Sequence, residues 1–170
     1  MSHDVNSHLR KEALVGGLSN AFFNGLIAWL LMKNGPDLAW TGQHSFVIDV
    51  IATAFLLPLI VALIVIPLQR SKLRKGKLAA VSLPEGSALG TFAARFPSST
   101  WKSALLFGLL GTLTFAPLAL FGFYLAGVTT LSPEFYAPFK GAWAGVMAAV
   151  LVVPMVLVAL RPASADAEPS

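Results

Sequence analysis

The chain carries four long apolar stretches separated by polar segments, and this pattern decides its fold class. The stretches cover residues 13–32, 46–68, 104–126 and 139–160. A helix of about twenty residues rises roughly 30 Å, which matches the hydrocarbon thickness of a bilayer. The second and fourth stretches are apolar on every side, whereas a helix of a water-soluble bundle keeps one polar face. The pattern therefore predicts an all-α integral membrane protein, a bundle of four transmembrane helices.

Composition agrees with this class and argues against catalysis. Hydrophobic residues make up 56% of the chain and charged residues 12%, about half the charged share of a soluble domain. The absence of cysteine excludes disulfides and thiol chemistry. There is no nucleotide-binding loop, no nucleophile elbow and no carboxylate cluster, and the three histidines are too scattered to bind one metal ion. We expect no enzyme activity, no cofactor and no metal site.

The distribution of positive charge predicts the orientation. Ten of the twelve Lys and Arg residues lie before the first stretch, between the second and third, or after the fourth. Lys and Arg near span ends stay on the cytoplasmic side, so both termini and the middle loop are expected there, in a bacterial-type inner membrane. The positive charge is then a topology signal rather than a sign of nucleic-acid binding. A basic run after the second span is also a candidate for anionic lipid headgroups: Arg70, Lys72, Arg74, Lys75 and Lys77.

The segments outside the four spans are short. Residues 1–12 form a cytoplasmic head before the transmembrane domain of residues 13–162, and the acidic, Ala-rich and Ser-rich tail, residues 163–170, is expected to be disordered. The cytoplasmic loop, residues 69–103, contains three large apolar residues at helical spacing: Leu89, Phe92 and Phe96. The segment 86–96 is therefore expected to be a helix that either lies along the membrane face or packs on the ends of the spans.

The two halves of the chain show a faint internal similarity. A shift of 92 residues aligns Gly16 with Gly108 and Phe23 with Phe115. Because each half contains two spans, both halves enter the membrane in the same direction. This arrangement is a parallel two-plus-two repeat. Chance matches in apolar sequence are the alternative explanation.

Each span also carries a narrow face of small or polar residues. In lipid, such faces allow close backbone approach and hydrogen bonds between helices, which replace hydrophobic burial as the driving force. We predict helix packing at Gly16, Gly108, Thr112, Gly141 and Gly145. The pair Gly141 and Gly145 forms a GxxxG pattern, which serves contacts inside one bundle or between protomers.

Four polar residues within the spans are candidates for solute contacts: Asn20, Asn24, Asp49 and Thr53. The alternative for the two asparagines is that they hold helices together through interhelical hydrogen bonds. Asp49 lies about one turn inside its span, where it is either a hydrated interfacial residue or, if packing encloses it, a cation or proton site. Lys140, near the same side of the fourth span, is expected to be solvated.

Two functions fit these features. The first is a small permease or channel-like protein for a small solute, oligomeric because four helices of such modest polarity enclose little space. The second is an accessory or assembly subunit that packs against a larger membrane complex through Gly141, Gly145 and the face of the first span. In both cases the bilayer is the surrounding medium.

Overall fold

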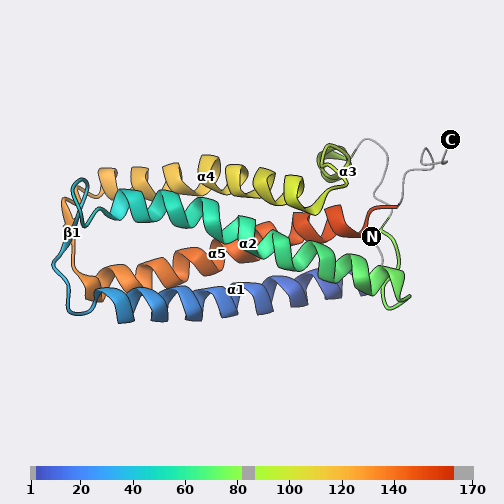
Figure 1. Cartoon of the computed structure of the whole chain (residues 1–170), viewed down its shortest axis with the longest axis horizontal. Coiled ribbons are helices and arrows are strands. Elements are labelled where there is room, and N and C mark those ends of the chain that lie inside the picture. The colour runs from blue at the N-terminus through green and yellow to red at the C-terminus, as the bar shows by residue number, and fades with distance from the viewer. Residues whose placement is uncertain (1–2, 82–86, 163–170) are drawn as a thin grey trace.

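The computed structural model describes residues 3–81 and 87–162 and contains four long helices (Figure 1). These are α1 His3–Met32, α2 Phe46–Arg74, α4 Thr100–Leu125 and α5 Pro133–Leu160. The short elements are α3 Ala88–Ala94, β1 Leu38–Ala39 and β2 Thr130–Leu131. The predicted tail lies outside the described residues, as does the first residue of the segment 86–96.

The predicted helical fold is confirmed, and all four long helices have the length and hydropathy that a membrane span requires. They contain 26 to 30 residues, so each is about 39–45 Å long, the thickness of a bilayer with its headgroup layers. Each is longer than the apolar stretch that predicted it at one end or both. In particular, α1 begins at His3, so most of the expected head continues the first span as helix.

The four long helices form a row in the order α1, α5, α2, α4. α1 packs on α5, α5 packs on α2, and α2 packs on α4 (Figure 1). In its most apolar window α5 has 67% of its residues buried and α1 has 11%. α5 is therefore the central helix, and α1 is a peripheral helix held mainly by α5.

Small residues bring α1 and α5 into backbone contact. A Cβ atom added to Gly145 would lie 2.7 Å from Ala21 Cβ and 2.9 Å from Gly17 O. One added to Gly141 would lie 2.7 Å from Ala21 O and 3.0 Å from Gly25 Cα. The GxxxG pattern of α5 therefore serves packing within the chain, with Gly17, Ala21 and Gly25 as its partners on α1.

Glycine residues also allow the close contact between α2 and α4. A Cβ on Gly108 would lie 3.0 Å from the Phe55 ring, and one on Gly111 would lie 2.6 Å from Pro58 Cγ. Gly108 is thus at a helix contact, and Gly111 next to it is tighter still. Thr112 instead donates its hydroxyl hydrogen bond to Gly108 O within α4, at 3.0 Å.

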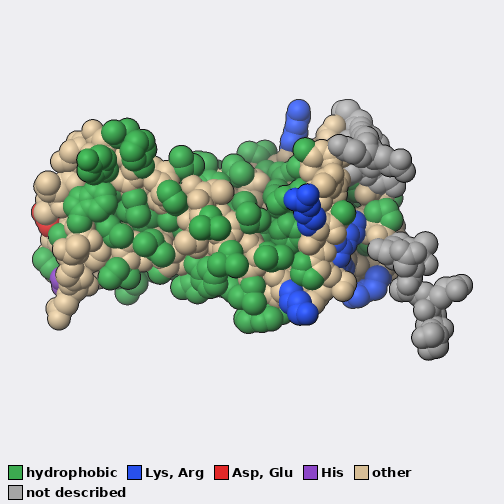
Figure 2. All heavy atoms as spheres, turned by 90° about the horizontal axis from the view of Figure 1, so that it is seen from above, with side chains coloured by type: hydrophobic (Ala, Val, Ile, Leu, Met, Phe, Trp, Pro, Cys, Tyr) green, Lys and Arg blue, Asp and Glu red, His purple; other side chains and the backbone are tan. Residues whose placement is uncertain are grey.

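The two ends of the bundle differ in chemistry. At the end we call the strand end, β1 pairs antiparallel with β2 and joins the two loops there. At the opposite end, which we call the termini end, α1 begins and α5 ends (Figure 1). On the face drawn in Figure 2, Lys and Arg side chains gather near the termini end, and hydrophobic side chains cover the length between the ends.

The segment with α3 packs on the termini end. Arg161 donates hydrogen bonds to the carbonyl oxygens of Ala93, at 3.0 Å, and of Phe96. The buried Phe96 ring stacks on Phe107 with centroids 4.6 Å apart, while Leu89 is 47% exposed. The C-terminal half of this segment therefore covers the helix ends, and its first turn faces outward.

Candidate functional site

A continuous row of residues on α1 runs from one end of the bundle to the other without facing outward. Residues four apart are neighbours on a helix surface and form a ridge. Every member of this ridge is buried or half-buried: His8, Glu12, Gly16, Asn20, Asn24, Ala28 and Met32. By contrast, Leu18 and Phe22 next to it are 70% and 62% exposed. We call this ridge the α1 polar row, since four of its members carry polar side chains.

Asn20 and Asn24 each direct one side-chain N–H to the backbone of α1. Asn20 Nδ2 donates to Gly16 O at 2.8 Å, and Asn24 Nδ2 donates to Asn20 O at 3.0 Å. Each amide hydrogen bond therefore stays within α1. Among the described residues, neither asparagine is bonded to another helix. Each side chain keeps its carbonyl oxygen as an acceptor and its second N–H as a donor, so it can bind an acceptor or a donor group of a polar solute.

Gly16, the remaining predicted member of this face, is not at the tightest approach. A Cβ on Gly16 would meet only Val152 Cγ2, at 4.0 Å, an ordinary van der Waals distance. The close contact with α5 is made by Gly17, one position along. The predicted stripe of α1 is therefore the edge of its packing face rather than the centre.

Asp49 is half-buried and paired. Its Oδ2 atom accepts a hydrogen bond from the Tyr136 hydroxyl at 2.6 Å, and Lys140 Nζ lies 2.7 Å from its carboxylate oxygens. The side chains of Lys140 and Asp49 are 14% and 27% exposed. The expectation that Lys140 is solvated is wrong, because packing of α5 on α2 directs its ammonium group to Asp49.

A cavity of about 370 Å³ lies at the strand end beside Asp49. Its walls come from the end of α1, the loop with β1 and the first turns of α2: Leu31, Met32, Gly35, Pro36, Leu38, Gln43, His44, Ser45, Ile48, Asp49 and Ala52. Of the four predicted solute contacts, Asp49 alone lines this cavity. Thr53, one turn further along α2, is buried at 8% exposure.

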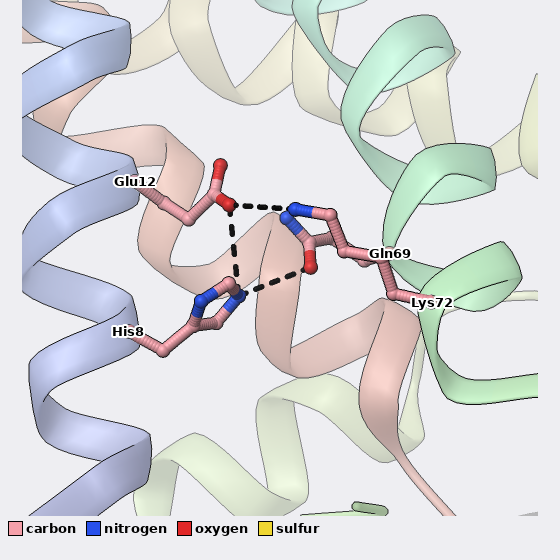
Figure 3. Close-up of polar contacts among 4 residues, drawn as sticks. All are labelled: His8, Glu12, Gln69 and Lys72. Atoms are coloured by element: carbon pink, nitrogen blue, oxygen red, sulfur yellow. Dashed lines mark hydrogen bonds and ion pairs between the residues drawn. The ribbon is translucent and has the colours of Figure 1, made fainter. Parts of the chain in front are cut away.

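A second polar cluster joins α1 to α2 at the termini end (Figure 3). His8 Nε2 lies 3.1 Å from Gln69 Oε1, and Lys72 Nζ lies 3.1 Å from Glu12 Oε1. His8 Nε2 is also 3.6 Å from Glu12 Oε1. Gln69 is fully buried, and its Nε2 atom has no hydrogen-bond partner among the described residues.

Sequence reasoning missed this cluster, because the apolar stretch begins after Glu12 and the preceding residues were assigned to a separate head. The available signal was spacing. Glu12 and His8 lie four and eight positions before Gly16, respectively, in register with Asn20 and Asn24.

The basic run after the second span divides into two parts. Arg70 Nη1 donates to Ser98 O at 2.8 Å and to Thr100 Oγ1 at 3.1 Å, and Lys72 pairs with Glu12. These two cations are engaged by the protein. The other three predicted headgroup residues are exposed: Arg74, Lys75 and Lys77.

Within the described ranges, no group of three or more His, Cys, Asp or Glu side chains is placed to hold a metal ion. Comparisons with protein-family models, with curated proteins and with solved structures found no match. The four candidate spans are those of a multi-pass membrane protein, and the part of the chain that the structure describes has a lysine-paired carboxylate at each end of the bundle.

Proposed function

We propose that this chain is a small permease that moves a small polar solute along the α1 polar row, between the strand-end cavity and the termini-end cluster. The observation that carries the proposal is the row itself. Polar groups recur along it about every 6 Å or 12 Å, as one or two steps of four residues require, and none of them faces outward. Polar side chains at membrane depth are costly unless they serve packing or a solute.

The position of α1 supports the same proposal. α1 and α2 both pack on α5. At the termini end the two helices are joined through Lys72 and Glu12, whose atoms lie 3.1 Å apart, and at the strand end both line the cavity. A solute that follows α1 between these points passes Asn24 and Asn20 in turn.

The accessory function loses its main support. That hypothesis used Gly141, Gly145 and the small face of the first span as a surface for another protein. Gly141 and Gly145 meet α1 of the same chain at distances that leave no room for a partner helix. The transport proposal needs no such surface.

We further propose the arrangement in the cell. The Lys-rich and Arg-rich termini end faces the cytoplasm of a bacterial-type cell, and the strand end faces outward. The pairing of α1 with α5 and of α4 with α2 is the pattern that a parallel two-plus-two repeat generates, which supports a duplication. The transport step involves no catalysis, and copies of the chain associate in the membrane.

Flux through purified protein in liposomes tests the proposal. The panel is urea, glycerol, methylammonium, butylammonium and butyrate, and uptake is compared with protein-free liposomes. Asn20→Leu with Asn24→Leu should abolish the protein-dependent uptake and leave the helical circular dichroism spectrum unchanged. Ser19→Leu is the matched control, because Ser19 is the exposed neighbour of Asn20 on the same helix. The proposal fails if no solute of the panel enters faster than in protein-free liposomes, or if the double variant transports as well as the control.

A further inference from the structure

The chemistry around Asp49 indicates which class of solute the strand-end cavity accepts. We propose that Asp49 binds an organic ammonium ion with an apolar body, and that the Lys140 ammonium group is a built-in competitor that the solute displaces. This inference rests on the proposed function, because it assigns the solute of that same path.

The geometry around the Asp49 carboxylate suits an ammonium ion. Lys140 places an ammonium group 2.7 Å from the Asp49 oxygens, and Tyr136 supplies one O–H donor at 2.6 Å. A primary ammonium ion offers the same three N–H donors as a lysine side chain. The Lys140 side chain therefore already places at Asp49 the functional group that we assign to the solute.

The composition of the cavity walls also favours an organic cation. Among the described residues, Asp49 is the one carboxylate of the cavity wall, and Gln43, His44 and Ser45 are its other polar side chains. The rest of the wall is apolar, with Leu31, Met32, Leu38, Ile48 and Ala52 among its members. A hard metal cation prefers several oxygen ligands, whereas one carboxylate beside an apolar wall suits a cation with a hydrocarbon body. The volume of about 370 Å³ is within the range of small-molecule sites.

Lys140 can reach the membrane interface when a solute displaces it from Asp49. It lies seven residues after the start of α5, so its Cα is roughly 10 Å from that end of the helix. Lysine side chains near span ends extend along the helix to place their charge at the interface. Exchange of one ammonium group for another keeps the net charge around Asp49 unchanged. Binding of a second cation while Lys140 remains paired would instead add a positive charge beside Asp49.

The far end of the row repeats the pairing of a carboxylate with a lysine. Between the ends, Asn24 and Asn20 each offer an acceptor oxygen and a second N–H donor, since one N–H of each bonds to the α1 backbone. At the termini end Glu12 is again a carboxylate paired with a lysine, Lys72, at 3.1 Å. The row therefore has a carboxylate at each end that can accept an ammonium group in exchange for its lysine, and the asparagine oxygens between them are acceptors for the same group.

Calorimetric titration of the full chain in lipid nanodiscs with butylammonium tests the inference, with butanol and butyrate as probes that lack the positive charge. Wild type should bind butylammonium about tenfold or more tightly than either control, as expected when a charge-assisted hydrogen bond decides affinity. Asp49→Asn should lose about tenfold or more in affinity, and Lys140→Met should gain a similar factor. Lys140→Gln, which keeps a neutral donor near Asp49, should bind more tightly than wild type as well and replaces Lys140→Met if that variant does not fold.

The charge-swapped variant Asp49→Lys with Lys140→Asp separates binding from folding. It keeps the ion pair between α2 and α5 but places the ammonium group at the cavity wall, so it should fold and not bind butylammonium. The inference is overturned if Asp49→Asn or the swapped variant binds like wild type, if butanol binds equally well, or if removal of the Lys140 charge brings no gain. Butylammonium binding without flux in liposomes keeps the ammonium site and rejects the permease. Flux of urea or glycerol without butylammonium binding keeps the permease and rejects the ammonium site.

Discussion

The contact between α1 and α5 leaves no space for a methyl group, and this gives a sharp prediction for Gly145→Ala. The new Cβ would lie 2.7 Å from Ala21 Cβ and 2.9 Å from Gly17 O, whereas carbon atoms in contact lie about 3.5–4.0 Å apart. Neither neighbour atom is at the end of a flexible side chain. The two helices must therefore move apart by roughly 0.8 Å or more at this point, and overpacking of this kind costs about 1–3 kcal/mol.

Gly122→Ala is the matched control, because a Cβ there meets nothing within 4 Å. Both variants gain the same intrinsic helix preference of alanine over glycine, about 1 kcal/mol. The difference in unfolding free energy between them therefore isolates the clash, at about 1–3 kcal/mol. The assay is unfolding by SDS in mixed detergent micelles, followed by circular dichroism. Equal midpoints for Gly145→Ala and Gly122→Ala would refute the close approach of α1 and α5.

Two further predictions follow from the cap of α2 and from the charge distribution. Ser45→Ala should lower the unfolding free energy by about 1 kcal/mol, because the Ser45 hydroxyl caps α2 by accepting a hydrogen bond from Ile48 N. Ser99→Ala is the control and should have little effect, because Ser99 makes no side-chain cap bond to α4 within the described residues. The same SDS titration compares the two variants. In intact cells, Gln43→Cys should react with a membrane-impermeant thiol reagent and Lys75→Cys should react only after permeabilisation, and the reverse order would contradict the proposed orientation.

The four spans were predictable because hydropathy is summed along one segment and needs no knowledge of neighbours. Which face of a helix meets its partner is a different kind of property. Two adjacent ridges of α1 carry small residues at four-residue spacing, one through Gly16 and one through Gly17, and both satisfy the same sequence pattern. The position of α5 selects the Gly17 ridge. That choice depends on a helix more than a hundred residues away in the sequence.

The sequence predicts three members of the candidate site, Asn20, Asn24 and Asp49, but neither the pairings of the site nor the termini-end cluster. The sequence predicts Asp49 as a cation or proton site only if packing encloses it, and that environment is set by Lys140 and Tyr136, which are 91 and 87 positions away. In the sequence alone, Lys140 and Tyr136 each have the features of an interfacial residue at a span end. The sequence places Glu12 in the cytoplasmic head, residues 1–12, because the first apolar stretch starts after it. The absence of any helix-breaking residue near it lets α1 extend back to His3.

Cysteine accessibility along α1 tests the central claim most directly, since the natural chain contains no cysteine and single replacements need no other change. Asn20→Cys and Asn24→Cys should react with a small, charged, water-soluble thiol reagent in membranes, because the account places a solute path along them. Leu18→Cys and Phe22→Cys, on the exposed apolar face, should be protected by lipid. Equal protection of all four cysteines would contradict a polar path along α1.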